Sequence, residues 1–255
     1  KSYQYSSLRH VVFRCLGRSN KMGREIIMAN KNKKKHWGMV IDLTRCVGCQ
    51  TCAVGCKIKN NLADGMWWNR VITVGGDHVD TAGGTYNHPM RYSIPLNCQN
   101  CENPICVDVC PTGASYQREE DNLVLVDYDK CIGCRACVEA CPYGVRLPNH
   151  NEPQYEHYDV QLGSDEVTPR YQGVVEKCTF CVERIDQGLN PFCTDVCPER
   201  ARYFGDLNDE DSDVSKLIRE NPVETLHPEL GTKPSVYFIP PSKKKTTRTG
   251  LDYIK

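Results

Sequence analysis

The sequence lacks a net charge, a long apolar run and the glycine-rich loops that hold nucleotides. Its 255 residues carry 32 Lys and Arg against 32 Asp and Glu, which excludes a globally basic nucleic-acid binder. No run approaches the roughly 18 apolar residues of a membrane span, and arginines interrupt the first thirty residues where a secretory signal needs an apolar core. G-x-G-x-x-G, phosphate-loop and nucleophile-elbow motifs are missing too, so nothing indicates a nucleotide, a flavin or a catalytic serine.

The zero net charge conceals basic ends around an acidic body. Residues 1–35 contain ten Lys or Arg and one carboxylate, and lysines recur at 243–245. Charge runs of this kind are usually solvated, although they also suit anionic lipid or an acidic partner. We therefore expect residues 1–35 to form a basic N-terminal arm.

Cysteine is the residue in excess, with 17 in the chain. Apart from Cys15, which we expect to bind no metal, the cysteines form four groups of four. The first and third groups read C-x2-C-x2-C-x3-C, and the other two lengthen the middle gap. In chain order the groups are Cys46, Cys49, Cys52 and Cys56; Cys98, Cys101, Cys106 and Cys110; Cys131, Cys134, Cys137 and Cys141; and Cys178, Cys181, Cys193 and Cys197.

This spacing is typical of 4Fe-4S sites. Three cysteines in one tight loop can hold three corners of a cubic cluster, whereas the fourth thiolate must approach from a second segment. In bacterial two-cluster ferredoxins the fourth cysteine of each run binds the other cluster. Gly48 and Gly133, each before the second cysteine of its group, permit tight loops whose amides can point at sulfur. Sixteen cysteines therefore predict four 4Fe-4S clusters.

Two other uses of cysteine fit the spacing less well. Zinc modules usually separate two C-x2-C pairs by a dozen or more residues and have no use for a third cysteine at the next step. Disulfides between cysteines three residues apart would mostly close small, strained loops.

A short apolar run precedes each cysteine group and predicts a strand. A helical turn is predicted within each of the first three groups, near its third and fourth cysteines. The expected strands are 39–43, 91–96, 123–128 and 173–176, and the expected helical turns are 51–60, 105–109 and 136–140. Repetition of this unit predicts an α+β fold built from bacterial-type ferredoxin modules.

The spacing between the groups predicts that one two-cluster module is nested inside another. The second and third groups are close in sequence and form an inner module over 96–148. The first and fourth groups form an outer module over 36–95 and 149–206. We expect the long segments at 59–90 and 149–172 and the tail 207–255 to be loops that dock partner proteins.

These motifs resemble a known family, the four-cluster iron–sulfur subunits of molybdopterin oxidoreductases. That family includes the B subunits of dimethyl sulfoxide, polysulfide, thiosulfate and tetrathionate reductases. The resemblance covers about residues 37–206, and 231–237 is similar to the tails of these subunits. The stretches that carry it are DLTRCVGCQTC at 42–52, CQNCENPIC at 98–106, CIGCRAC at 131–137, CPYG at 141–144 and KCTFC at 177–181.

The resemblance implies how the cysteines are shared among four clusters. The implied ligands are Cys46, Cys49, Cys52 and Cys197 for cluster 1; Cys98, Cys101, Cys106 and Cys141 for cluster 2; Cys131, Cys134, Cys137 and Cys110 for cluster 3; and Cys178, Cys181, Cys193 and Cys56 for cluster 4. Basic residues beside or near these ligands are candidates for tuning the cluster potentials. They are Lys177, Arg45 and Arg135, with Lys57 and Arg146 as further members.

The resemblance also implies an electron-transfer subunit that is not catalytic alone. Its expected partners are a molybdopterin (Mo or W) catalytic subunit and a quinone-linked membrane anchor or other redox partner, in anaerobic respiration. It implies no nucleic acid and no direct small-molecule substrate. The subunit would associate with the membrane through its partners. The expected side is the extracytoplasmic face, and the cytoplasmic face is the alternative. A freestanding polyferredoxin and the beta subunit of an anchor-less transhydroxylase or dehydroxylase are the alternatives.

Overall fold

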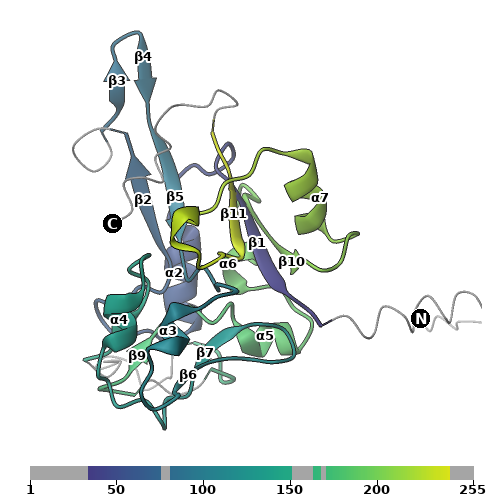
Figure 1. Ribbon diagram of the computed structural model, residues 1–255. Coiled ribbons are helices and arrows are strands. Elements are labelled where there is room, and N and C mark those ends of the chain that lie inside the picture. The colour runs from purple at the N-terminus through teal and green to yellow at the C-terminus, as the bar shows by residue number, and fades with distance from the viewer. Residues whose placement is uncertain (1–33, 76–80, 151–162, 168–170, 242–255) are drawn as a thin grey trace, which may run out of the picture. The chain divides into compact units, whose positions relative to one another are not determined.

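The computed structural model describes residues 34–75, 81–150, 163–167 and 171–241 (Figure 1). Almost all of the predicted basic arm, the lysines at 243–245 and Cys15 lie outside the described residues. Within the described ranges, no helix is both long enough and apolar enough to cross a membrane.

Short strands and short helices alternate along the chain and form an α+β fold. The strands are β1 (Trp37–Asp42), β2 (Arg70–Val74), β3 (Gly83–Thr85), β4 (His88–Met90), β5 (Tyr92–Leu96), β6 (Ser115–Gln117), β7 (Val124–Val126), β8 (Leu147–Pro148), β9 (Val175–Glu176), β10 (Arg202–Asp206) and β11 (Val236–Ile239). The helices are α2 (Thr51–Lys59), α3 (Ile105–Asp108), α4 (Ala136–Ala140), α5 (Val182–Asp186), α6 (Phe192–Asp195) and α7 (Asp213–Glu220), with the 3-10 turn η2 (Pro228–Leu230).

The predicted relation between strands, cysteine groups and helices is confirmed. β1, β5, β7 and β9 lead into the four groups in turn, and α2, α3 and α4 follow within the first three. Helix α2 begins at Thr51 although its N-cap residue, Gln50, lies in the left-handed region with φ 65°. Arg135 before α4 repeats this geometry with φ 64°. The two C-x2-C-x2-C-x3-C groups therefore fold in the same way.

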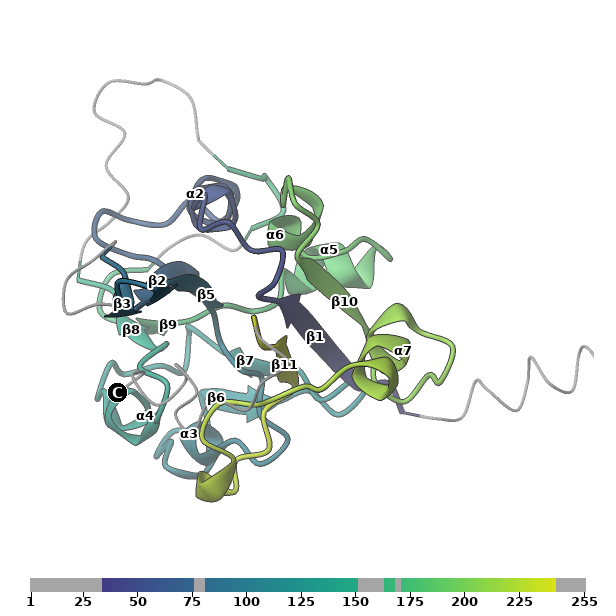
Figure 2. The ribbon, with the colours of Figure 1, turned by 90° about the horizontal axis from the view of Figure 1, so that it is seen from above.

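The same strand pairing occurs twice. β1 leads into the first group and pairs antiparallel with β10, which follows the fourth group. β7 leads into the third group and pairs antiparallel with β6, which follows the second group. The helices repeat the arrangement, because α2 packs against α6 and α3 packs against α4. Figure 2 shows these two helix pairs in separate parts of the molecule.

Much of the core consists of cysteine side chains together with apolar residues. Met39, Ile41 and Phe238 of the β10-β1-β11 sheet are buried, with exposed fractions of 1% or less. They belong to one cluster of buried side chains that also contains cysteines of three groups. These cysteines are Cys52, Cys56, Cys98, Cys178 and Cys193.

The expectation that the long segments are loops was wrong in two places. Segment 59–90 contains β2 and the β3–β4 hairpin, which extends beyond β2 and β5 in Figure 1. Segment 207–255 contains α7 and β11, and β11 completes the central sheet by pairing parallel with β1. The Val-Tyr-Phe-Ile run of β11 has high strand propensity, and Ser212 caps α7. Docking of partners by residues 207–255 stays a prediction.

Candidate iron–sulfur centres

Each of the four cysteine loops bends sharply at the residue before its second cysteine. The φ angles there are 72° at Gly48, 45° at Asn100, 65° at Gly133 and 57° at Phe180. The two glycines were predicted from the sequence, whereas the asparagine and the phenylalanine adopt the same left-handed conformation at a cost that glycine avoids. One backbone shape is therefore repeated four times.

The bend turns backbone N–H groups toward sulfur. The amide nitrogens of Asn100 and Phe180 each lie 3.4 Å from the Sγ of the first cysteine of their loop, Cys98 and Cys178. The amide of Ala201 lies 3.3 Å from Cys197 Sγ, which makes the same kind of contact after the fourth cysteine. Such N–H donors favour the thiolate form, which is the form that binds metal.

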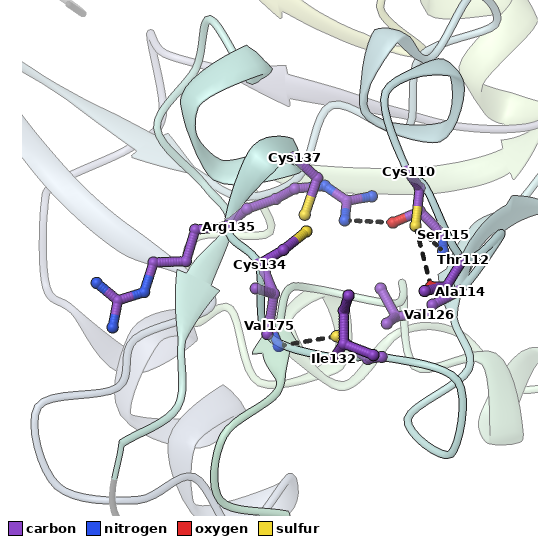
Figure 3. Close-up of a pocket in the computed structure, with 13 residues that line it drawn as sticks. Cys110, Thr112, Ala114, Ser115, Val126, Ile132, Cys134, Arg135, Cys137 and Val175 are labelled. Atoms are coloured by element: carbon purple, nitrogen blue, oxygen red, sulfur yellow. Dashed lines mark hydrogen bonds between the residues drawn. The ribbon is translucent and has the colours of Figure 1, made fainter.

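Cys110, Cys131, Cys134 and Cys137 line one pocket, which is drawn in Figure 3. The space between its lining atoms is about 320 Å³, including open solvent. Cys134 and Cys137 lie on one side and Cys110 faces them from another segment. The amide of Ser115 donates to Cys110 Sγ at 3.4 Å, and the amide of Val175 donates to Cys131 Sγ at 3.4 Å. Three cysteines of the third group thus share a pocket with the last cysteine of the second.

A second pocket, with about 360 Å³ of space that includes open solvent, is lined by Cys98, Cys101, Cys106 and Cys141. It reverses the exchange seen in the first pocket, because here the last cysteine of the third group joins the second group. Burial raises the pKa of the Cys101 thiol to about 12, and the neighbouring Cys98 adds to this effect. Thiols held together in this way stay protonated unless a cation replaces their protons.

In the remaining two groups, each last cysteine is an electrostatic neighbour of cysteines in the other group. Cys56 of the first group has Cys178, Cys181 and Cys193 as its interacting neighbours, and burial followed by these thiols raises its pKa well above the ordinary value. Burial likewise raises the pKa of Cys193 to about 11. In the other direction, Cys46 has both Cys52 and Cys197 as neighbours. All sixteen described cysteines are free of disulfides.

The cysteines of the two pockets fit polynuclear clusters in two respects. Four thiols line each pocket, and backbone N–H donors point at sulfurs in both of them. Among the described residues, no three Cys, His, Asp or Glu side chains converge tightly enough to hold a single metal ion. In a 4Fe-4S site, iron would supply the positive charge that the buried thiolates need.

Solvent exposure differs strongly among the cysteines. Cys56, Cys178, Cys181 and Cys193 are all buried. Cys49 and Cys134, in contrast, are exposed. Each exposed cysteine has an exposed apolar residue two positions before it, Val47 at 66% and Ile132 at 67%.

The candidate tuning residues differ in burial. Lys177 is 1% exposed and therefore buried, whereas Arg45 and Arg135 are both exposed. Arg45 donates to the hydroxyl of Tyr203 at 3.0 Å, and Figure 3 shows Arg135 directed away from the pocket. Their influence on clusters stays a prediction, and solvent screening weakens that of the two arginines.

Sequence reasoning missed one basic residue, Arg202 of β10. Its side chain is 3% exposed and interacts with cysteines of the first and fourth groups. An arginine five residues after a cysteine carries no recognisable motif, but the pairing of β10 with β1 directs it into the core. Only the tertiary structure brings it beside the thiols.

Comparison with known proteins agrees with this geometry. A family described as a 4Fe-4S dicluster domain matches residues 90–165 and 166–207, and one described as a 4Fe-4S binding domain matches residues 43–67. The chain is 51% identical over 211 residues to the putative iron-sulfur subunit of a dimethyl sulfoxide reductase from Halobacterium salinarum, covering 80% of this chain and 79% of that protein.

Two more distant relatives are also reductase subunits. The chain is 39% identical over 230 residues to the arsenate respiratory reductase iron-sulfur subunit of Shewanella sp., covering 79% of this chain and 95% of that protein. It is 33% identical over 219 residues to a subunit of the anaerobic dimethyl sulfoxide reductase of Escherichia coli, covering 86% and 95%. The family resemblance seen in the cysteine motifs is confirmed. The chain therefore belongs to the family of iron–sulfur B subunits of dimethyl sulfoxide, arsenate and related reductases, whose cofactors are 4Fe-4S clusters.

Proposed function

We propose that this chain is an electron-transfer subunit that holds four 4Fe-4S clusters and relays electrons between a molybdopterin catalytic subunit and a second redox partner in anaerobic respiration. The observation that carries the proposal is the exchange of last cysteines between the second and third groups in two pockets, with Cys56 and Cys197 as neighbours of cysteines in the other two groups. Bound 4Fe-4S clusters supply one-electron transfer at potentials set by their surroundings. The chain supplies the thiolates, the amide donors and the shielding from solvent.

We propose the same ligand sets that the family resemblance implies. Set 1 comprises Cys46, Cys49, Cys52 and Cys197; set 2 comprises Cys98, Cys101, Cys106 and Cys141; set 3 comprises Cys131, Cys134, Cys137 and Cys110; and set 4 comprises Cys178, Cys181, Cys193 and Cys56. The exchange of last cysteines between groups supports this assignment. The paired helices α2 with α6 and α3 with α4 support an outer module around an inner one.

The neighbour relations between the sets support a row in the order 1, 4, 2, 3. Cys193 of set 4 interacts with Cys52 of set 1, and Cys178 of set 4 interacts with Cys98 of set 2. Arg146 lines both the set 2 and the set 3 pockets. The exposed cysteines belong to sets 1 and 3, at the two ends of the row, whereas set 4 is buried. Electrons would then enter at one end and leave at the other.

The partners in this proposal follow from the relatives. Their names describe iron–sulfur subunits of dimethyl sulfoxide and arsenate reductases, whose chemistry requires a separate catalytic chain. We propose that the catalytic molybdopterin subunit docks near one exposed end and a quinone-linked membrane anchor near the other. Membrane association would then come through partners, on the extracytoplasmic face.

The test begins with iron and acid-labile sulfide in anaerobically purified protein, together with the polypeptides that copurify. About sixteen of each per chain is expected. Zinc without sulfide would overturn the proposal. A chain that carries the clusters but purifies alone as a stable monomer would indicate a freestanding polyferredoxin, and a catalytic partner without an anchor would indicate the transhydroxylase type.

Cysteine variants test the ligand sets. Cys110→Ser and Cys134→Ser are expected to alter the same low-temperature EPR signal of the reduced protein, because both cysteines line one pocket. Cys141→Ser is expected to alter the signal that Cys101→Ser alters. Cys110→Ser and Cys101→Ser altering one common signal would overturn the exchange between groups.

A further inference from the structure

Arg202 is a buried cation with no carboxylate within ion-pair distance among the described residues. Its Nη2 lies 2.6 Å from Asn97 Oδ1 and 3.2 Å from Met39 Sδ, and its Nη1 lies 3.5 Å from Asn69 Oδ1. Its Nε has no hydrogen-bond partner in the described part of the chain. Burial of a charge among neutral groups alone is costly. The functional protein must therefore hold an anionic group close to this guanidinium.

Cysteines of two sets are the electrostatic neighbours of Arg202. Cys193, Cys178 and Cys56 belong to set 4, and Cys52 belongs to set 1. Arg202 thus lies at the junction between sets 1 and 4.

Arg146 occupies the corresponding place between sets 2 and 3. It is 2% exposed, and its Nη2 lies 3.0 Å from Cys106 Sγ of set 2. It also interacts with Cys137 of set 3. Its Nη1 donates to Ser115 Oγ at 2.7 Å, and the amide of Ser115 in turn donates to Cys110 of set 3.

Lys177 lies at the remaining junction, between sets 4 and 2. Its Nζ donates to the backbone oxygen of Cys178, a member of set 4, at 2.9 Å. The same Nζ donates to the backbone oxygen of Val124, which lines the set 2 pocket. Lys177 also interacts with Cys106 of set 2.

The absence of carboxylates is specific to the junctions. Four basic side chains are buried in the part of the chain that the structure describes, and the fourth, Lys59, forms an ion pair with Glu183. None of the other three has a carboxylate within ion-pair distance among the described residues. Each of these three instead lies near cysteines of two neighbouring sets.

We propose that Arg202, Lys177 and Arg146 are fixed positive charges along the electron path, one at each junction of the row. Each raises the reduction potentials of the two clusters between which it lies. This inference rests on the proposed function. In each step one electron leaves one side of a junction and arrives on the other. No bond forms or breaks, and the cation keeps its proton. Because water is excluded, a fixed positive charge stabilises the added electron strongly.

The experiment is an EPR-monitored redox titration of the anaerobically purified complex, with two crossed variants at one site. Arg202→Lys keeps the charge but loses the planar guanidinium, whereas Arg202→Gln keeps a planar N–H donor group and loses the charge. We expect Arg202→Gln to shift the midpoint potentials of the signals from sets 1 and 4 to more negative values. Arg202→Lys is expected to keep the midpoint potentials of sets 1 and 4 close to the wild-type values. The midpoint potentials of sets 2 and 3 are expected to stay unchanged in both variants.

Two further variants complete the test. Arg146→Gln is expected to shift the midpoint potentials of sets 2 and 3 to more negative values and to leave that of set 1 unchanged. This variant tests the proposal if Arg202→Gln loses iron. Arg45→Gln removes the same charge one residue from Cys46 but in an exposed position, and a small shift is expected.

The outcomes separate this inference from the proposed function. Unchanged potentials in both Gln variants at full iron content would overturn the role of the fixed positive charges and leave the four-cluster relay intact. Equal shifts of all four signals, or a shift in Arg202→Lys as large as in Arg202→Gln, would also overturn it. A wild-type protein without about sixteen iron atoms would overturn the relay itself.

Discussion

Trp68 donates a hydrogen bond of 3.2 Å from Nε1 to Oε2 of Glu176, and both side chains are buried. Asn149 donates from Nδ2 to the other carboxylate oxygen at 3.1 Å. Glu176 ends β9 directly before Lys177 and the fourth cysteine group. The contact therefore ties the segment after the first cysteine group to the strand that positions the fourth.

Trp68→Phe is expected to destabilise the protein by about 1–3 kcal/mol, because it removes a donor from a buried carboxylate oxygen. The matched control is Trp67→Phe, since Trp67 is 40% exposed. Its effect should stay within about 0.5 kcal/mol. Anaerobic urea unfolding followed by circular dichroism measures both, and equal midpoints for the two variants would contradict the prediction.

Gly133→Ala is expected to remove one cluster. A Cβ at this position would lie 2.0 Å from the backbone oxygen of Gly173, and φ is 65°. The clash involves backbone on both sides, so the loop that carries Cys131 and Cys134 has to move. Iron content is expected to fall from about sixteen to about twelve atoms per chain.

Gly113→Ala controls for the backbone strain in that experiment. Gly113 has nearly the same φ of 66°, but nothing lies within 4 Å of an added Cβ. It should cost only about 1–2 kcal/mol for the left-handed conformation and keep all of its iron. Loss of iron in both variants would mean that the conformation, rather than the clash with Gly173, decides cluster binding.

Sequence patterns predicted the site much better than the connections between its parts. Cysteine spacing and short apolar runs are local, so the loops, the strands that lead into them and α2, α3 and α4 were all predictable. The parallel pairing of β11 with β1 joins residues such as Met39 and Val236, which are far apart in the sequence, and no local signal specifies such a pairing. Arg202 was missed for the same reason.

Helix α7 was missed although its sequence contains a start signal. Ser212 Oγ accepts a hydrogen bond from the amide of Ser215 at 3.2 Å and donates to the backbone oxygen of Asp206 at 2.7 Å. Val214 is fully buried against the sheet. An N-cap serine followed by one buried valine is a weak signal in isolation, and the packing against β10 completes it.

Ser212→Ala is expected to destabilise the protein by about 1 kcal/mol through loss of the helix cap. Ser212→Asp retains a capping oxygen and should recover most of this loss. Hydrogen exchange of the α7 amides measures the effect locally, with faster exchange in Ser212→Ala alone. Similar exchange in both variants would show that the cap contributes little to α7.

The stability of the protein should depend on the charge of His36. Burial lowers the pKa of His36 below its ordinary value of 6.5, although Glu102 and Asp206 partly oppose this. The unfolded chain therefore binds the proton more readily than the folded protein. The resulting stability is fully present above the unfolded pKa and is lost as pH falls below about 6.5 toward the folded pKa.

His36→Gln separates this titration from the hydrogen bond. His36 Nε2 lies 2.9 Å from Ser235 Oγ, and that hydroxyl donates its own proton to the backbone oxygen of Asn100 at 2.8 Å. Nε2 must therefore be the donor, a role that the glutamine amide can fill without titrating. Between about pH 7.5 and about pH 5.5, the urea midpoint is expected to fall more in the wild type than in His36→Gln. A difference between the two proteins that stays constant with pH would mean that His36 keeps its ordinary pKa, because only a group whose pKa changes on folding makes stability depend on pH.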